Sequence, residues 1–538
     1  MTAGRFGAAF LVGALACVIV ALATASPGPG LDPDAMSYLG AAQSLVRYDV
    51  YRVPTSSWAA SDSSEPLSHF PPGFSTAIAV PVSEGLSPVQ SARLLIVVAA
   101  FCTWAGIVLV VSAAAGTGVG VMTGVVALAT PALLNVHLSV LSEPLFLAVL
   151  VAILAGIVEI IDPGPRLRGR REWRGVWAAS WTGPLLLAAV MLRYAGVALV
   201  GAAAIAALIG PVDPRRRWRT RIIRLVLISV PAAWALSAWL VRSVHLAGAK
   251  SVRALGLYGN LGETVREGLG TARDWLVPAG DGQWRGPVAW MLGAGAVMLA
   301  IHAWRRRRQG AAAVAWLRQN PEIDAHRAAV LLRAVVLTGG VYLAFVAVSR
   351  AVADPSIPFD ERILSPAILL AEIGLGVALA LWWPGRGQVA RVAVGFVVMA
   401  WFLASAVTSA TRVQLALGDG NDFAGSDWRD SPTVAWVRAP DGGANRVLYT
   451  NWPAALYFNA GRASHDVPDV TDALTLRRFR DRLARSHGVV VAFSAPNSDV
   501  APPDSVARVL GLRQIARFSD GSVWGLARDS AVVGAGVK

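Results

Sequence analysis

Residues 91–113 read SARLLIVVAAFCTWAGIVLVVSA, an apolar run in which Arg93 is the only charged side chain. A helix needs about 20 mainly apolar residues to cross the hydrocarbon core of a bilayer. Comparable runs recur along the chain and predict a polytopic α-helical membrane protein with about eleven spans. These lie near residues 6–25, 91–113, 117–134, 142–161, 175–192, 195–211, 222–242, 287–303, 329–349, 363–383 and 391–410.

The overall composition agrees with a membrane protein. The chain is 55% hydrophobic and 15% charged, whereas soluble domains carry about 25% charged residues. The net charge of +14 comes largely from arginines in short connections between apolar runs. No basic patch is interleaved with aromatic residues, so no nucleic-acid partner is expected. Cys17 and Cys102 both fall inside predicted spans, so no disulfide framework is expected.

The basic connections also predict the orientation in the cell (plasma or inner) membrane. With a cytoplasmic N-terminus, four of them fall on the cytoplasmic side, as the positive-inside rule requires. The first apolar run is too long for a convincing cleavable signal peptide. Loop 26–90 and the tail after residue 410 then lie outside the cytoplasm. The four cytoplasmic connections are Arg166–Arg174, Arg215–Arg224, Arg305–Arg308 and the Arg386/Arg391 turn.

The tail changes character after residue 410 and predicts a second domain over 411–538, beside a transmembrane domain over 1–410 that includes the outer loop 26–90. A polar linker rich in Gly and Asp leads into alternating strand-like and helix-like runs, which favour a small α/β domain. The strands are expected at 446–450, 489–493, 512–518 and 523–527, and the helices at 474–486 and 504–510.

The outer loop begins with two nearby carboxylates, Asp32 and Asp34, in the stretch LDPDAMSYLGAA at residues 31–42. Asp34 precedes an apolar helical face and is expected at the helix N-cap position. Such a cap is the simplest interpretation of Asp34. The loop continues to His69-Phe70-Pro71-Pro72-Gly73-Phe74, a corner in which consecutive prolines fix the direction of the chain.

Taken together, these motifs resemble the GT-C superfamily of membrane glycosyltransferases, in particular the protein mannosyltransferase and aminoarabinose transferase-like group. The shared pattern is an acidic residue after the first span, Tyr38 four residues later, and the Pro-Pro-Gly-aromatic corner. The resemblance implies a sugar donor linked to polyprenyl phosphate and a glycan, lipid or protein acceptor outside the cytoplasm. It also implies that Asp34 is the catalytic base, with Asp32 in reserve.

Three further segments fit the resemblance. Leu141–Phe146 resembles the second acidic motif and makes Glu143 the matching catalytic carboxylate. Arg193 lies at an outer hairpin, and Arg362 resembles the arginine of an Arg-x-x-x-Pro segment. The resemblance places Tyr38, His69, Arg193, Asp360 and Arg362 in the substrate-binding part. The chain departs from the pattern at His69-Phe70, where some relatives carry a Lys or Arg that contacts phosphate.

The expected chemistry suits these residue types. Transfer with inversion needs a carboxylate to take the acceptor proton, and it needs cations to hold the departing phosphate. Arginine is suited to the second role because its guanidinium bonds two phosphate oxygens at once and keeps its charge. A structural alternative stays open, in which Glu143 caps its helix and pairs with Arg193, while Arg362 pairs with Asp360 or snorkels to the membrane surface.

Other polar residues carry weaker predictions. Asn135 and His137 are expected in an outer turn, and His465 is expected on the surface of the tail. No cluster has convincing metal-ligand spacing. No cofactor is therefore assigned, although Asp32 and Asp34 could together hold a divalent cation.

Two other functional classes stay open. A secondary transporter or lipid flippase would be expected to show internal repeats and charged residues near the middle of its spans. Neither pattern is evident, because the charged candidates gather at the outer ends of the predicted spans. The third class is a non-catalytic membrane scaffold with an extracytoplasmic binding domain.

Overall fold

The computed structural model describes residues 3–162, 171–212, 217–248, 256–258, 261–278, 324–383, 386–440, 442–468, 472–495, 497 and 500–526. The predicted span 287–303 and the basic residues at 166–170 and 305–308 lie outside this part. The chain divides into two compact units. We call the first the helical unit (Met1–Ala23, His69–Phe74 and Arg93–Gln414) and the second the mixed unit (Thr24–Ser68, Ser75–Ala92 and Leu415–Lys538).

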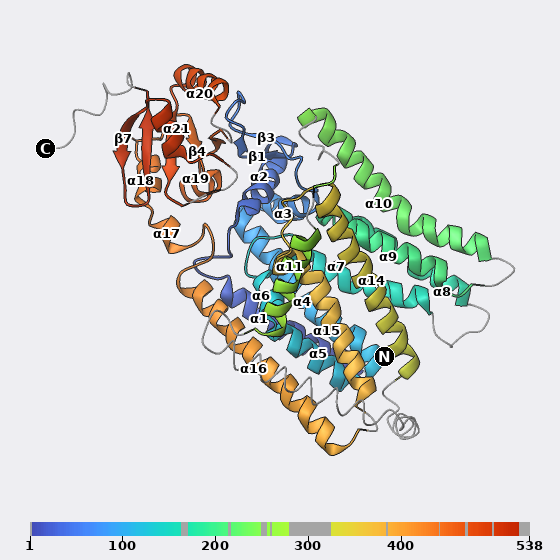
Figure 1. The fold of residues 1–538 in the computed structure, drawn as a ribbon. Helices are drawn as coiled ribbons and strands as arrows, with labels where there is room; N and C mark the ends of the chain where they lie inside the picture. The colour runs from blue at the N-terminus through green and yellow to red at the C-terminus, as the bar shows by residue number, and fades with distance from the viewer. Residues whose placement is uncertain are drawn as a thin grey trace. The chain divides into compact units, whose positions relative to one another are not determined.

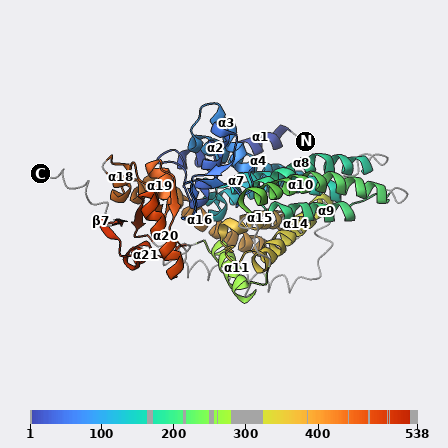
Figure 2. The ribbon, with the colours of Figure 1, turned by 90° about the horizontal axis from the view of Figure 1, so that it is seen from above.

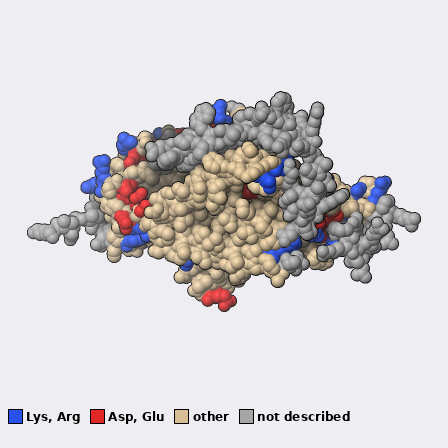
Figure 3. Space-filling view, turned by 90° about the horizontal axis from the view of Figure 1, so that it is seen from below, with Lys and Arg blue, Asp and Glu red and all other residues tan. Residues whose placement is uncertain are grey.

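Long apolar helices dominate the described part of the chain, as the hydropathy predicted. Eight of them are long and apolar enough to cross a membrane, so the chain is a multi-pass membrane protein. Figure 3 shows a broad surface whose charged side chains lie mostly toward its margins. The eight helices are α1 (Ala3–Ala23), α4 (Pro88–Ala115), α7 (Glu143–Ile161), α8 (Arg171–Leu192), α10 (Arg217–Ala247), α14 (Ala325–Val352), α15 (Glu361–Trp382) and α16 (Gln388–Gly418).

Three apolar helices are shorter, namely α3 (Gly73–Ser83), α5 (Thr117–Ala129) and α9 (Gly196–Ile209). The prediction of one helix over 117–134 is therefore wrong. Pro131 opens a separate short helix, α6 (Pro131–Asn135), because proline fits the first turn of a helix but interrupts its interior. Helix α11 (Leu261–Leu276) also belongs to the helical unit, whereas α3 lies mostly in the mixed unit.

Glycines allow close packing between the helices of this unit. Helix α8 packs against α7 and α10, and α14 packs against α15 and α9 (Figures 1 and 2). A Cβ atom on Gly183 of α8 would lie 2.1 Å from the Leu227 carbonyl oxygen of α10. One on Gly156 of α7 would lie 2.1 Å from Thr182 Oγ1 of α8. Small residues let membrane helices approach in this way, since lipid offers no hydrophobic force between them.

A six-stranded sheet forms the centre of the mixed unit, in the order β2-β5-β4-β6-β8-β7. The first four strands are parallel, and β8 is antiparallel to both β6 and β7. The strands are β2 (Thr55–Ser56), β4 (Leu448–Thr450), β5 (Ser464–Asp466), β6 (Val489–Phe493), β7 (Arg513–Arg517) and β8 (Gly521–Gly525).

The helices of the mixed unit contribute side chains to one apolar core with the sheet. Tyr449 and Val490 from the sheet pack with Phe479 and Leu483 of α20 and with Val506 of α21. The burial of these apolar side chains stabilises the unit. Its helices are α2 (Pro33–Tyr48), α17 (Ser426–Arg429), α18 (Pro432–Arg438), α19 (Pro453–Ala460), α20 (Ala473–Ser486) and α21 (Pro503–Val509), and β1 (Arg52–Val53) pairs with β3 (Glu65–Pro66).

The α/β character of the tail was predicted correctly, but the segment of the chain that folds with it was not. The outer loop forms one unit with the tail, because β2 of the loop pairs in parallel with β5. A Leu31–Asp422 bridge and a hydrogen bond of 3.3 Å from Tyr457 to Gln43 add to this connection. The division of the chain therefore differs from the expected one, which grouped loop 26–90 with the membrane helices.

Candidate functional site

A buried carboxylate with two arginines lies where α7 and α15 begin. Glu143 is 1% exposed, forms ion pairs with the guanidinium groups of Arg193 and Arg362, and accepts a hydrogen bond from Arg362. The arginine side chains are 13% and 28% exposed. We call these three residues the arginine clamp.

The local sequence explains how the arginine clamp is placed. Helix α7 begins directly at Glu143, with Ser142 at the N-cap and a proline in the first turn. Arg362 lies in the first turn of α15, after Asp360, which caps the helix by accepting a hydrogen bond of 2.9 Å from the Ile363 amide. Burial raises the pKa of the Asp360 carboxyl group.

The partners of these residues settle the structural alternative in part. Glu143 pairs with Arg193, as that alternative proposed, but Ser142 holds the cap position. Arg362 pairs with Glu143, and it also interacts electrostatically with Asp360, as the alternative proposed.

The Pro-Pro-Gly corner approaches the same hairpin. A Cβ atom on Gly73 would lie 2.5 Å from the Met191 carbonyl oxygen and 3.1 Å from the Leu192 amide nitrogen. Any side chain at position 73 would collide with this backbone, so only glycine permits the approach. Met191 and Leu192 directly precede Arg193 in the sequence. His69 is exposed, and its ring lies 4.7 Å from that of Phe70. The structure thus brings the corner motif to the hairpin that carries Arg193.

Two further ion pairs include or contact residues just before Arg362 in the sequence. Glu361, beside Arg362, accepts hydrogen bonds of 2.8 Å from both Asn135 and Arg412. Glu267 pairs with Arg350 and accepts a hydrogen bond of 2.8 Å from the Phe359 amide. Although burial opposes the charge, these two contacts lower the pKa of Glu267.

The acidic start of α2 belongs to the mixed unit. Asp32, rather than Asp34, is the N-cap, and its Oδ1 accepts a hydrogen bond of 2.9 Å from the Ala35 amide. The predicted cap was wrong because Pro33 fits the first helical position, which makes the preceding residue the cap. Asp34 lies half-buried in the first turn, and Tyr38 is 2% exposed. Asp32 therefore has the capping role, and Asp34 is not the cap residue.

Three polar residues differ from their predictions or were missed. His137 lies in a turn, as expected, but it is fully buried, and burial lowers its pKa to about 4. His465, expected on the surface, is 2% exposed. Glu372 was missed: it lies halfway along α15, 4% exposed, with hydrogen bonds of 2.6 Å from Thr130 and 3.2 Å from Trp275. The sequence signal for this residue was a single glutamate inside an apolar run.

No family model matches the sequence, and no curated protein matches it. Among solved structures, the chain is similar to ArnT from Cupriavidus metallidurans bound to undecaprenyl phosphate. The TM-score is 0.53 at 14% identity, over 96% of this chain and 97% of that one. It is also similar to a mutant of the arabinofuranosyltransferase AftD from Mycobacteria, with a TM-score of 0.54 at 15% identity.

The second similarity covers 98% of this chain but 42% of AftD, so the chain spans less than half the length of that protein. At these identities the comparisons show the fold alone. The chain has the fold of the GT-C membrane glycosyltransferases, which confirms the sequence resemblance. They leave the roles of individual residues as predictions.

Proposed function

We propose that the chain is a membrane glycosyltransferase that takes a sugar from a polyprenyl-phosphate donor. The observation that carries this proposal is the arginine clamp, Glu143 with Arg193 and Arg362, in a chain with the GT-C fold. Guanidinium groups fixed side by side match the oxygens of a phosphate and keep their charge. The similar ArnT structure contains undecaprenyl phosphate, a ligand of the class proposed here.

In the proposed reaction an acceptor hydroxyl attacks the anomeric carbon of the sugar. The new bond joins the acceptor oxygen to that carbon, and the bond from the carbon to the phosphate oxygen breaks, with inversion. Asp34 takes the acceptor proton, a role worth roughly 10²- to 10⁴-fold in rate. Arg193 and Arg362 hold the departing polyprenyl phosphate, and Glu143 positions both arginines. The sequence resemblance assigns Tyr38, His69 and Asp360 to binding of the donor and acceptor.

The proposed topology puts this chemistry outside the cytoplasm of a plasma or inner membrane. The N-terminus is cytoplasmic and the tail is extracytoplasmic, because the basic connections then lie inside. The acceptor is a glycan, a lipid or a protein. Adding EDTA during turnover tests whether a divalent cation joins Asp32 and Asp34, since loss of turnover that Mg²⁺ or Mn²⁺ restores would establish one.

The decisive experiment measures transfer from labelled polyprenyl-phosphate sugars by purified protein. Asp34→Asn should lower turnover by about 10² or more while carrier binding survives. Asp32→Asn is the matched control: Asn caps a helix about as well as Asp, so this variant should fold and turn over normally. Normal turnover in Asp34→Asn would reject the base, and a dead Asp32→Asn with normal folding would move the base to Asp32.

The buried Glu372 supports a second candidate, a transporter or lipid flippase. Ionisable residues in the middle of a span are costly, and they commonly mark transport pathways. In proteoliposomes this candidate predicts that labelled polyprenyl-phosphate sugar crosses the membrane and that Glu372→Gln abolishes the movement. Sugar transfer by purified protein, without net movement of the carrier, would decide for the glycosyltransferase.

A further inference from the structure

The mixed unit contains a cavity of about 530 Å³ that the proposed reaction does not use. It lies between the start of β4, the segment before β5, the end of α20 and the 61–63 turn of the outer loop. Its volume is within the range of roughly 300–1,000 Å³ usual for small-molecule sites. The polar side chains of its lining include Arg446, Arg462, Arg482, Arg485 and His465.

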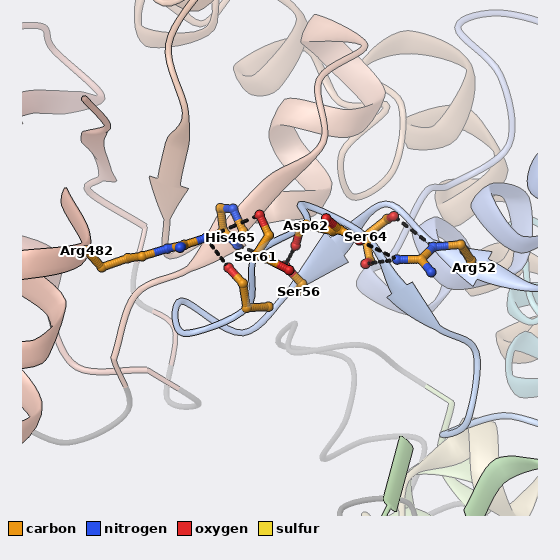
Figure 4. A network of polar contacts seen from close by, with 8 residues as sticks. Arg52, Ser56, Ser61, Asp62, Ser64, His465 and Arg482 are labelled. Carbon is orange, nitrogen blue, oxygen red and sulfur yellow. Dashed lines mark hydrogen bonds and ion pairs between the residues drawn. The ribbon is translucent and has the colours of Figure 1, made fainter. Parts of the chain in front are cut away.

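Two of these arginines build the wall of the cavity. Arg462 donates hydrogen bonds of 3.0 Å to the Gly443 carbonyl oxygen and 2.9 Å to the Arg446 carbonyl oxygen. Arg482 donates to the carbonyl oxygens of Ala60 and Ser61 and so joins α20 to the outer loop (Figure 4). The Nε atom of Arg482 is buried and has no hydrogen-bond partner within the described part of the chain.

The other two arginines are less engaged. Arg485 donates one hydrogen bond of 3.3 Å to the Asp481 carbonyl oxygen of its own helix. For the Arg446 side chain, the described residues offer no hydrogen bond or ion pair. These two guanidinium groups can therefore turn toward a ligand without breaking a tertiary contact.

His465 adds a hydrogen-bond acceptor beside these donors. Ser56 Oγ donates 2.5 Å to the Asp62 carbonyl oxygen, so it must accept from His465 Nδ1, which lies 2.8 Å away (Figure 4). The proton therefore resides on Nδ1 and the lone pair on Nε2. Burial lowers the pKa of His465 and favours this neutral form. Its ring stacks on Tyr449 at 5.0 Å, which fixes the orientation of the imidazole.

Among the described residues, those that line the cavity include no carboxylate. The neighbouring Asp62 is exposed and pairs with Arg52 at 3.5 Å. The described lining thus has four guanidinium groups and no acidic side chain, and such a concave basic site attracts anions. Ser61, Ser63 and Ser486, which also line it, offer hydroxyl groups that both donate and accept hydrogen bonds.

We infer that this cavity binds an anionic carbohydrate, a sugar that carries a phosphate or carboxylate group. The guanidinium groups of Arg446 and Arg485 would contact the anionic group, while His465 Nε2 and the serine hydroxyls would contact sugar hydroxyls. The inference goes beyond the proposed function, because such binding requires no transfer reaction. The inference is therefore tested by equilibrium binding, and the binding should persist in the Asp34→Asn protein.

The test is calorimetric titration of the purified full chain with glucose 6-phosphate, inorganic phosphate and glucose. Glucose 6-phosphate should bind more tightly than either of the other probes. Arg446→Ala and Arg485→Ala should each weaken its binding about tenfold, as expected for the loss of a charge-assisted hydrogen bond. Arg480→Ala is the matched control, since this exposed arginine of the same helix does not line the cavity and should leave binding unchanged.

Several results would overturn the inference. These are no binding of glucose 6-phosphate, equal binding of glucose, equal binding of inorganic phosphate, or an Arg480→Ala effect as large as that of Arg485→Ala. Thermal unfolding of each variant checks that it has folded, and Arg446→Ala and Arg485→Ala provide two independent tests.

A lipid arm identifies the source of the anion. The titration is repeated in nanodiscs of phosphatidylcholine, with and without phosphatidylglycerol. Weaker probe binding with phosphatidylglycerol supports the site and assigns a lipid headgroup as the competing ligand. Unchanged probe binding supports the site and assigns a glycan outside the bilayer. Loss of probe binding in both nanodiscs overturns the inference.

Discussion

Replacement of Glu143 by glutamine removes the negative charge at the centre of the arginine clamp. The side chain keeps its size and its place in the first turn of α7, and Glu143 is 1% exposed, so little water can replace the lost interaction. Arg193 and Arg362, which both contact this carboxylate, would then lose the buried counter-charge that they share. We expect Glu143→Gln to destabilise the helical unit.

The size of the effect follows from the geometry. Unit charges about 4 Å apart attract by about 4 kcal/mol at an effective dielectric constant near 20, and Glu143 has two such partners. Removing the carboxylate also removes its desolvation cost. Loss of one partner from a buried ion pair therefore costs about 3–5 kcal/mol in practice. The exposure of 13% and 28% for the arginines favours the lower end, about 3 kcal/mol.

The assay is denaturant unfolding in mixed detergent micelles, followed by tryptophan fluorescence. Glu84→Gln is the matched control, because Glu84 is exposed and loses the same charge. The double variant Glu143→Gln/Arg193→Met should recover part of the loss, since it removes one of the two opposed cations. If Glu143→Gln unfolds with the same free energy as Glu84→Gln, the carboxylate does not hold the two arginines, and this account of the clamp fails.

Three other predictions follow from the same structure. Arg362→Lys should weaken binding of polyprenyl phosphate about tenfold, because Lys cannot form the paired hydrogen bonds of a guanidinium. Normal turnover in this variant would make Arg362 a structural partner of Glu143. A reporter that is active only in the cytoplasm, fused after Gly418 at the end of α16, should be silent, and activity would put the span count off by one. Burial lowers the pKa of His137 from its ordinary 6.5 to about 4. The contribution of neutral His137 to the free energy of unfolding should therefore be complete above pH 6.5, and that free energy should fall by about 3 kcal/mol as the pH drops toward 4. His137→Gln should flatten that dependence in thermal unfolding, and an unchanged pH profile would contradict the assignment.

Features encoded within a short stretch of sequence were predicted well. The strand over residues 489–493 has the predicted bounds, and the helix at 474–486 begins one residue earlier than expected. The eight helices long enough to cross a membrane followed from the length of their apolar runs, which is a local property. Glu143, Arg193 and Arg362 were each singled out by the resemblance of short motifs, and the structure brings them into contact.

Features that depend on distant pairing could not be predicted in this way. The two-residue strand β2 is too short to show any periodicity, and it pairs with a strand about 400 residues later. The burial of His465 follows from that pairing, because Ser56 of β2 contacts its ring. Glu372 was hidden for a different reason: a hydropathy window tolerates one charge, so the run around it still predicts a span.

The distribution of ion pairs favours the clamp as the anion site of the helical unit. Glu361 pairs with one arginine, Arg412, and Glu267 with one, Arg350, so each of these pairs is neutral. Glu143 contacts two arginines, so this cluster offers two adjacent guanidinium groups where α7 and α15 begin. A neutral pair gains little from an approaching phosphate, because attraction to the cation is offset by repulsion from the acid. Within the described residues of this unit, the clamp is thus the ion-pair cluster best suited to hold a phosphate.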